Sequence, residues 1–493
     1  MKFTGICVRA ALWVLASTVV ASFMWAQQPL PLDYHAVFRT HVPHINSQAG
    51  ASGGAASNNG RASNLSNMGG SPDTVGPMVT LTTSAPEGEE YIAVDPTSMN
   101  NLVAVISDFS LRGGYNTTKY AVSFSNGGAG TWSENFVPLL NGSPATSDSQ
   151  TWEANSDPVV AIDKSGNVFA SNLYLNGSNS ANGLYVSVGQ LTSPDLGFSV
   201  AGTYPVVANL SPTAGVDEDK DWMTVDNTNH AATSGNVYVS WTHFIGSASN
   251  MIYFSKSIDH GKTWSAPLQV SDAWQNNAVQ GSQMAVGPGG ELYLAYEVFF
   301  VGNQRGLYLV KSTDGGQSFS PSVAITPLFN ELNFNSTYRK NSFPSLAVSP
   351  VNGNVYVVYS DQPNPTVGAE VEFILSKDGG ITFTSPVVLN NPSRGQQFFP
   401  SIAVDGTGEI HVSWFDTRNS SKNTSSYDIY ATNSVSDGSK FSANVRVTPA
   451  SIDAGNTGFI GDYMGIAASA GFAHPVWTSG GWNNGLLKTA TLH

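Results

Sequence analysis

The chain has 493 residues, a formal net charge of −14 and only 11% charged residues. An acidic chain with few cations is a poor candidate for binding nucleic acid or an anionic membrane surface. The single cysteine, Cys7, lies near the N-terminus, so disulfides, Cys-based zinc sites and a thiol nucleophile are excluded from the rest of the protein.

The first 26 residues have the pattern of a secretory signal peptide. Lys2 and Arg9 form a basic start, residues 11–26 are apolar, and cleavage is expected after Ala21 or Ala26. The apolar run is too short to make a convincing membrane anchor. We therefore expect export to the periplasm or the medium, without membrane insertion.

Residues from about 45 to 76 are mainly Ser, Gly, Asn and Ala, with almost no large apolar side chains. This composition is typical of a flexible spacer. The sequence therefore predicts a signal peptide at 1–26, a linker at 27–76 and one folded domain at 77–493.

A pair of strand-like runs joined by a tight turn recurs through this domain. One copy reads Ser401-Ile-Ala-Val-Asp405, then the turn 405–409, then Ile410-His-Val-Ser-Trp414. The first runs of the seven copies, the last one weak, begin at Tyr91, Val159, Trp222, Gln283, Ser345, Ser401 and Met464.

A second repeated pattern follows later in several units, and we call its copies the aspartate turns. The copies begin at Ser257, Ser312 and Ser376, with a worn copy at Ser434. The first reads Ser257-Ile-Asp-His-Gly-Lys-Thr-Trp264. An Asp side chain can accept hydrogen bonds from nearby backbone N–H groups, and Gly supplies the positive φ of a hairpin corner.

Four antiparallel strands in each unit of roughly sixty residues predict an all-β fold, a β-propeller. We expect seven blades, with six as the alternative. The last unit ends after its third strand, and a spare strand, 78–82, precedes the first unit. We expect this N-terminal strand to complete the last blade and close the ring. A tandem of β-sandwiches would not require a missing strand at one end and a surplus strand at the other.

The loops fall into two sets. The short turns, including the aspartate turns, share one face, and the long loops and inter-blade links share the other, where binding is expected. Six arginines follow residue 77, and all but Arg446 fall in the long-loop set: Arg112, Arg305, Arg339, Arg394 and Arg418. They either bind an anionic group through their planar forks or pair with neighbouring carboxylates, as Asp416 beside Arg418 suggests.

Acidic residues gather on the same face, several of them directly before an innermost strand. They include Glu89, Glu90, Asp157, Asp217, Glu218, Asp219, Asp221, Glu297, Asp361, Asp416 and Asp462. Such carboxyls either perform general acid/base chemistry or cap loop backbones. The run 217–221 could also hold calcium, although it lacks a recognised loop spacing, so no cofactor or metal is otherwise predicted.

The aspartate turn at Ser257–Trp264, with its copies at Ser312 and Ser376, resembles the Asp box (BNR repeat) of the sialidase-like propellers. The resemblance covers residues 78–493 as a repeat pattern. It implies a secreted glycoside hydrolase of exo-sialidase type, in which three arginines bind the sugar carboxylate, a Glu activates a Tyr nucleophile and an Asp is the acid/base. The chain departs from the family because residues 76–94 contain no arginine and because seven blades replace six.

Carried onto this sequence, the resemblance assigns Tyr463 as nucleophile and Glu297 as its base. Asp221 or Asp157 would be the acid, and Arg339, Arg394 and Arg418 would hold the substrate. Arg305 and Arg112 would support binding on the same face.

Three functions remain open at this point. The first is a glycoside hydrolase acting on exposed, possibly acidic, glycans. The second is a non-catalytic propeller that binds glycan or protein at the cell surface, which the absent first-blade arginine favours. The third is a lyase acting on uronic-acid polymers, for which His243 is the one histidine clearly on the long-loop face. The oligomeric state is not predicted.

Overall fold

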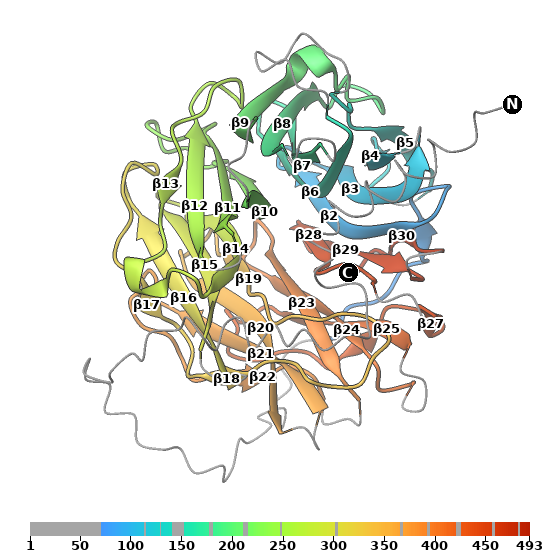
Figure 1. Ribbon diagram of the computed structural model, residues 1–493. Helices are drawn as coiled ribbons and strands as arrows, with labels where there is room; N and C mark the ends of the chain where they lie inside the picture. The colour runs from blue at the N-terminus through green and yellow to red at the C-terminus, as the bar shows by residue number, and fades with distance from the viewer. Residues whose placement is uncertain are drawn as a thin grey trace, which may run out of the picture.

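The computed structural model describes residues 71–112, 115–128, 130–140, 152–176, 181–210, 215–246, 249–300, 304–364, 368–391, 395–420, 425–455, 459–481 and 484–493. The expected signal peptide and most of the expected linker lie outside this range. The described residues form seven antiparallel sheets arranged as blades around one axis (Figure 1). The prediction of a seven-bladed β-propeller is confirmed.

Each blade begins with its innermost strand and continues outward. Blade 1 contains β2 (Glu87–Asp95), β3 (Ser98–Arg112), β4 (Tyr115–Ser123) and β5 (Ser133–Phe136). Blade 2 contains β6 (Ala154–Ile162), β7 (Asn167–Leu175), β8 (Asn182–Gln190) and β9 (Thr203–Asn209), with the short helix η2 (Val200–Gly202) before β9. Blade 3 contains β10 (Val216–Val225), β11 (Val237–Ile245), β12 (Ser249–Ser257) and β13 (Leu268–Gln269), followed by η3 (Ala273–Gln275).

The remaining blades follow the same order. Blade 4 contains β14 (Val279–Val286), β15 (Leu292–Phe299), β16 (Gln304–Ser312) and β17 (Val323–Ala324), with β18 (Phe329–Asn330) also paired to β16. Blade 5 contains β19 (Ser345–Val348), β20 (Val355–Asn364), β21 (Gly368–Ser376) and β22 (Val387–Val388). Blade 6 contains β23 (Gln397–Val404), β24 (Ile410–Asp416), β25 (Ser426–Ser434) and β26 (Val445–Arg446), with β27 (Ile452–Asp453) paired to β25. Blade 7 contains β28 (Gly465–Ser469), β29 (Phe472–Ser479), β30 (Leu486–Thr489) and β1 (Val79–Thr80).

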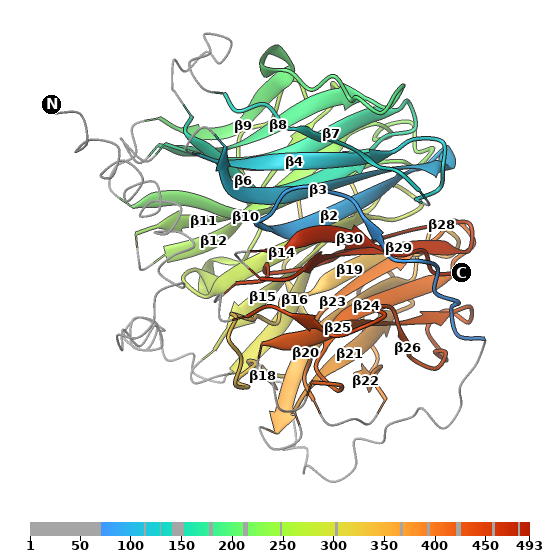
Figure 2. The ribbon, with the colours of Figure 1, turned by 90° about the vertical axis from the view of Figure 1, so that its right-hand side faces the viewer.

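The two ends of the chain meet in blade 7, as expected. β1 pairs with β30 through Val79 and Thr489, and β28–β30 lie beside blade 1 (Figures 1 and 2). Pairing begins before residue 77, because Val75 bridges to Leu492 and Thr74 exchanges backbone hydrogen bonds with His493. The propeller therefore includes residues 74 and 75, which the sequence analysis assigned to the linker.

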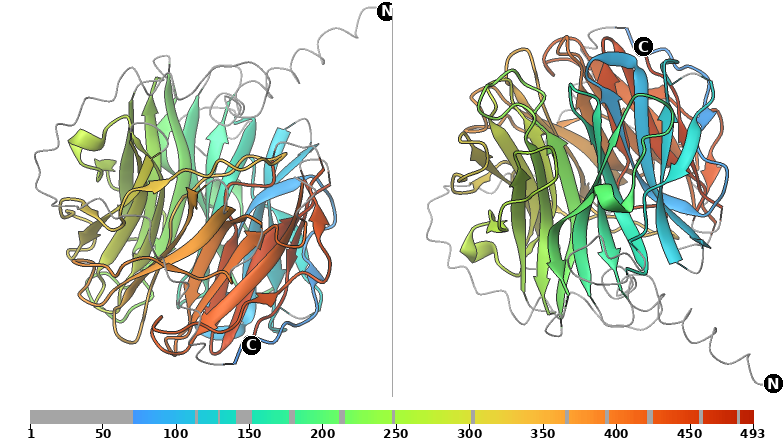
Figure 3. Two further views of the ribbon diagram at one scale, coloured as in Figure 1. Left: turned by 90° about the horizontal axis from the view of Figure 1, so that it is seen from below. Right: turned by 90° about the horizontal axis from the view of Figure 1, so that it is seen from above.

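The core lies between neighbouring blades, where apolar faces of adjacent sheets pack together. The second strands of blades 3, 6 and 7 each bury a tryptophan completely, at Trp241, Trp414 and Trp477. The blades stand side by side around the ring, so that turns and loops gather at its two ends (Figure 3). Within the described chain, no helix is long and apolar enough to span a membrane.

The aspartate turns form the predicted corners between third and fourth strands. In the turn after β21, Gly380 N–H donates to Ser376 Oγ at 2.8 Å, and Thr382 N–H donates to Asp378 Oδ1 at 2.9 Å. The turns that begin at Ser257 and Ser312 repeat these bonds. A hydrogen bond from the Thr382 hydroxyl lowers the pKa of Asp378, so this carboxylate stabilises a turn.

Candidate functional site

The innermost strands of five described blades carry a β-bulge near their N-terminal ends. One residue in each bulge has a φ between 50° and 71°, and these residues are Glu89, Asp157, Lys220, Gly281 and Phe399. Each lies two residues before the start of the repeated strand run of its blade, at Tyr91, Val159, Trp222, Gln283 or Ser401. A bulge redirects a side chain out of the strand alternation. Left-handed backbone at a non-Gly residue costs about 1–2 kcal/mol, and such residues are concentrated at functional sites.

The bulges of blades 1–3 and the links into blades 5 and 7 bring eight polar side chains together. We call this set the channel cluster: Glu89, Asp157, Asp219, Lys220, Asp221, Arg339, Asp462 and Tyr463. Its members are buried, except that the side chains of Arg339 and Asp462 are 16% and 17% exposed. The cluster therefore combines five carboxyl groups with two cations, and the Arg339–Asp462 pair is its most exposed part.

Lys220 lies at the aromatic side of the cluster. Its Nζ is 3.6 Å from the ring centroid of Tyr463 and 5.5 Å from that of Trp222. The Tyr91 ring packs edge-on against Trp222 at 4.7 Å. These contacts hold the ammonium against aromatic faces, which attract a cation.

Arg339 forms a two-pronged contact with Asp462. Its Nε donates to Asp462 Oδ1 at 2.6 Å, and its Nη2 donates to Oδ2. Nη2 also lies 3.6 Å from Glu89 Oε1, and the guanidinium stacks on Phe459 at 4.6 Å. This planar, bidentate geometry is the one in which arginine binds a carboxylate.

Burial shifts the ionisation of the cluster toward neutral forms. The pKa of Glu89 lies well above its ordinary value because of burial and the neighbouring Asp157 and Asp462. The pKa values of Asp219 and Asp221 are raised for the same reasons, burial first and Asp157 second. Burial also lowers the pKa of Lys220.

Two reactive atoms of the cluster are left without partners. Asp221 Oδ2 accepts a hydrogen bond from Ser171, whereas Asp221 Oδ1 is buried with no hydrogen-bond partner among the described residues. The Tyr463 hydroxyl is unpaired in the same sense, and burial followed by Glu89 and Asp157 raises its pKa well above the ordinary value. Buried polar atoms are normally satisfied, so these two indicate a ligand, a water or a reacting group.

Blades 4, 5 and 6 present a different surface to the axis. Gly281, Phe343 and Phe399 replace charged residues there, followed by Pro344 and Pro400. A cavity of about 10 Å³ lies between this aromatic surface and the Lys220–Tyr463 side of the cluster. A space of this size holds about one water molecule. Entry of a sugar ring therefore requires movement, and the partly exposed Arg339–Asp462 pair is the group nearest to solvent.

The predicted base Glu297 is placed differently. It lies on β15, a second strand, and its Oε1 is 3.4 Å from Nε of Arg305, which also pairs with Glu331. Burial, opposed by Arg305, raises the pKa of Glu297 to about 8. Among the described residues, Glu297 thus belongs to an ion-pair group around Arg305 and is not brought to Tyr463. The predicted pairing of these two residues is not retained.

The predicted arginine clamp is not formed by the two of its arginines that the structure describes, Arg339 and Arg418. Arg418 pairs with Asp416, with Nη2 to Oδ2 at 2.6 Å, and stacks on Tyr430 at 4.0 Å. This is the neighbouring-carboxylate alternative. Arg394 and the side chain of Arg112 lie outside the described residues. Of the predicted arginines, Arg339 alone is shown at the channel cluster.

The acidic run 217–221 does not converge on one point. Glu218 accepts hydrogen bonds from Trp241 Nε1 at 2.6 Å and lies 2.9 Å from His243 Nδ1, whereas Asp219 and Asp221 belong to the channel cluster. Asp217 accepts from Asn182. Because β10 sends these carboxylates to different neighbours, the hypothesis of a calcium site in this run gains no support. His243 is accounted for by its contact with Glu218.

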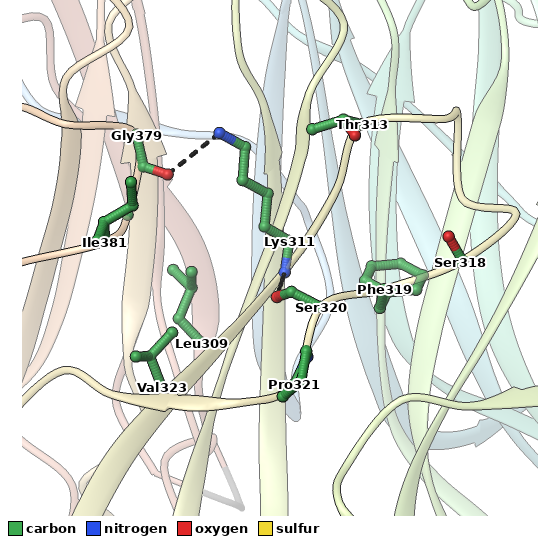
Figure 4. A pocket seen from close by; sticks show the side chains of 11 residues that line it. Leu309, Lys311, Thr313, Ser318, Phe319, Ser320, Pro321, Val323, Gly379 and Ile381 are labelled. Carbon is green, nitrogen blue, oxygen red and sulfur yellow. Dashed lines mark hydrogen bonds between the residues drawn. The ribbon is translucent and has the colours of Figure 1, made fainter.

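A larger cavity, of about 460 Å³, lies away from the channel between the aspartate turns of blades 4 and 5 (Figure 4). Leu309, Val323 and Ile381 line it, and Lys311 Nζ donates to the Gly379 carbonyl at 3.1 Å. With its one lysine already engaged, this hollow offers apolar contact but no acid/base pair.

Lys220 is not among the predicted site residues, and Glu89 is predicted only as one of the acidic residues of the long-loop face, without a catalytic role of its own. A usable signal existed, because the residue two positions before the start of the repeated strand run is charged in blades 1, 2 and 3. The need for a bulge to turn these residues to the axis was not visible from the pattern alone.

No family model matches the chain, and no curated protein matches it. Solved structures do resemble it. A protein of unknown function from Dyadobacter fermentans is 13% identical, with 84% of this chain and 97% of that chain covered and a TM-score of 0.47. The Hadza microbial sialidase Hz136 is 13% identical, with 76% and 72% covered and a TM-score of 0.43. A GH93 α-L-arabinofuranosidase of Fusarium graminearum is 13% identical, with 55% and 92% covered and a TM-score of 0.37. At this similarity they assign neither activity nor site residues to this chain.

Proposed function

We propose that this protein is a glycoside hydrolase and that the channel cluster supplies its acid/base chemistry. The observation that carries the proposal is the cluster itself: several buried carboxyls with raised pKa values surround an unpaired tyrosine hydroxyl, next to an arginine in bidentate geometry. Glycoside hydrolysis requires a protonated carboxyl near neutral pH beside a second group that acts as base or nucleophile.

Asp221 fits the general acid. Its carboxyl is 1% exposed, its pKa is raised by burial and by Asp157, and its Oδ1 is free to face a leaving-group oxygen. Asp157 is the partner carboxyl, held by Ser156 Oγ at 3.1 Å. In the hydrolase that we propose, proton transfer runs from Asp221 to the glycosidic oxygen.

Tyr463 fits the nucleophile, with Glu89 replacing Glu297 as the nearby carboxyl. Glu89 lies close enough for its charge to raise the pKa of Tyr463. In this proposal, ionised Glu89 takes the phenol proton as Tyr463 attacks the anomeric carbon, and water then releases the sugar from Tyr463. A neutral phenol meets less repulsion from an anionic sugar than a carboxylate would. Arg339 would hold an acidic substituent of the substrate by exchanging Asp462 for it.

The test is product release from a panel of glycans by the purified protein and by Asp221→Asn and Tyr463→Phe variants. Loss of a general acid lowers the rate by about 100- to 10,000-fold. Asp217→Asn is the matched control, because it removes a carboxyl from the same strand but outside the channel cluster, and we expect it to keep full activity. No release from any glycan by folded protein would overturn the hydrolase proposal, and so would full activity of both variants.

Export is part of the same proposal, because residues 1–26 have the pattern of a secretory signal peptide. N-terminal sequencing of protein recovered from the medium or periplasm should show a start at residue 22 or 27. Recovery of protein that still begins at Met1 would contradict it.

A further inference from the structure

Blade 6 is not covered by an aspartate turn from the next blade, because blade 7 is completed by two separate parts of the chain. In the repeat, the aspartate turn of one blade packs on aromatic side chains of the preceding blade. A Cβ placed on Gly261, in the turn after β12, would lie 3.3 Å from Phe169 of blade 2, and one on Gly380, in the turn after β21, would lie 3.4 Å from Tyr293 of blade 4. The turn over blade 6 would have to come from blade 7, between β30 and β1. Those strands belong to opposite ends of the chain, so no continuous turn exists there.

The two chain ends occupy this position instead. Thr74 N–H donates to the His493 carbonyl at 2.5 Å, and His493 N–H donates to the Thr74 carbonyl at 3.1 Å. This pairing carries Asp73 over blade 6, where its carboxyl is buried. Beneath it lies His411 of β24, whose register partner on the innermost strand is Ala403. The corresponding second-strand residues of blades 3, 4 and 5 are tyrosines: Tyr238, Tyr293 and Tyr356.

Three potential metal ligands meet at this point. One carboxylate oxygen each of Asp73 and Glu409 and one ring nitrogen of His411 all lie within 4.8 Å of one another. Asp73 Oδ2 is 3.6 Å from His411 Nδ1, which is too long for a hydrogen bond. His411 is fully buried, and across the described chain neither of its ring nitrogens finds a hydrogen-bond partner, nor does Asp73 Oδ2.

A fourth residue orients this group. Asn433 lies directly opposite His411 in the β24–β25 pair, and its Nδ2 donates to Glu409 Oε1 at 2.8 Å. Its Oδ1 is buried and also lacks a hydrogen-bond partner in the described part of the chain. An amide that fixes a carboxylate in this way resembles the outer partners that position metal ligands.

We infer that Asp73, Glu409 and His411 form a binding site for a divalent transition-metal ion of the Zn²⁺ type, which joins the N-terminal segment to blade 6. Two carboxylates and a neutral imidazole balance the charge of a divalent ion. Imidazole with carboxylate ligands suits zinc and its neighbours, whereas calcium and magnesium prefer oxygen ligands alone. Asn433 Oδ1 or a water would supply the fourth ligand that zinc usually takes.

A buried Asp–His contact with no metal is the competing explanation. An unpaired buried carboxylate is costly, and a protonated imidazole would relieve that cost. The two explanations differ in one measurable respect, because only the first gives the cluster an affinity for Zn²⁺.

The experiment titrates Zn²⁺ into the tag-free, chelator-treated full chain by calorimetry and compares wild type with Asp73→Asn and Glu409→Gln. Both substitutions keep side-chain shape and remove one ligand charge. Glu291→Gln is the matched control, because Glu291 occupies the same turn position before β15, where the nearby second-strand residue is Tyr293. Loss of an outer partner weakens metal binding by about 10–100-fold, so loss of a ligand should exceed about 100-fold.

We expect one Zn²⁺ per chain in wild type and in Glu291→Gln, and loss of that site in the other two variants. Zn²⁺ should also raise the thermal midpoint of wild type but not of Asp73→Asn. Absence of one-to-one binding in wild type would overturn the inference, and so would equal affinity in all four proteins. Glu409 is only half-buried, so Glu409→Gln should fold and can still test the inference if Asp73→Asn folds poorly. Zn²⁺ affinity does not depend on hydrolase activity, so this inference and the proposed function can fail separately.

Discussion

The two halves of the central channel are built from the same repeat but are lined by different side chains. At the bulge position, blades 1, 2 and 3 carry Glu89, Asp157 and Lys220, whereas blades 4 and 6 carry Gly281 and Phe399. The backbone is left-handed at all five positions. The comparison shows that the repeat fixes where a side chain is directed, and that the residue at that position decides whether the channel wall is charged or apolar.

The largest effect should come from breaking the charge balance of the charged half. Lys220→Met removes a buried cation that faces Asp157, Asp462 and Asp221. Leaving buried charges without a partner costs about 3–5 kcal/mol, and we expect a loss of that size in the free energy of unfolding, measured by urea denaturation. Lys262→Met, at an exposed position, is the control and should change stability by less than about 0.5 kcal/mol. Equal stability of the two variants would refute the assigned role of Lys220.

The apolar half should be sensitive to volume instead of charge. A Cβ on Gly281 would lie 2.2 Å from Phe343, at a φ of +71°. Left-handed backbone costs about 1–2 kcal/mol for a non-glycine residue, and overpacking adds about 1–3 kcal/mol. Gly281→Ala should therefore lower the free energy of unfolding by about 2–5 kcal/mol. Gly197→Ala, at a φ of +65° with open space around it, isolates the backbone part. If both variants lose the same stability, the contact with Phe343 carries no cost.

In the charged half, a raised carboxyl pKa should make the free energy of unfolding fall as pH rises. Burial raises the pKa of Glu90 in blade 1 from 4.5 to about 8, although Thr478 donates two hydrogen bonds to it. The folded protein holds this proton more tightly, so the stability it contributes is present below about pH 4.5 and is lost as pH rises toward 8. Glu90→Gln should remove up to about 1.4 kcal/mol per pH unit of that decline, as measured by urea denaturation at several pH values.

Asp314 provides the opposite sign for the same measurement. A hydrogen bond from Ser318 lowers the pKa of this aspartate-turn carboxyl, so its contribution is lost as pH falls. Asp314→Asn should lower the free energy of unfolding by a constant amount above pH 5 and flatten the acid side of the stability curve. A curve for Glu90→Gln that is parallel to wild type between pH 5 and 8 would contradict the assignment for blade 1.

The smallest effect concerns what the two halves share. Ser257 in blade 3 and Ser312 in blade 4 each accept a hydrogen bond from the turn glycine at 2.8 Å. Replacing either serine by alanine should cost about 1 kcal/mol, and the two losses should agree within about 0.5 kcal/mol. A clear difference in thermal unfolding between Ser257→Ala and Ser312→Ala would show that the charged residues of a blade affect the stability of its outer turn.

Sequence reasoning succeeded where the repeat carried the information. The number of blades, the aspartate turns and the closing strand at 78–82 all follow from spacing and from the missing last strand. It succeeded less at the site, because contacts across the ring depend on bulges that a strand pattern does not reveal. Glu297 and Tyr463 both lie on the long-loop face, yet one is on a second strand and the other precedes an innermost strand. Composition likewise assigned Asp73 to the linker, although pairing with the last residue brings it onto blade 6.

The pairing of β1 with β30 also sets the order of events during synthesis. Val79 and Thr489 are among the first and last residues of the ring, yet they are direct neighbours in one sheet. Blades 1 to 6 can each form from consecutive chain as it leaves the ribosome, whereas blade 7 waits for its third strand. Contacts of such long sequence separation form slowly because the intervening chain must first be closed into a loop. Until then, blades 1 and 6 face an open gap, so a propeller of this design is most exposed to aggregation and proteolysis before β30 pairs with β1.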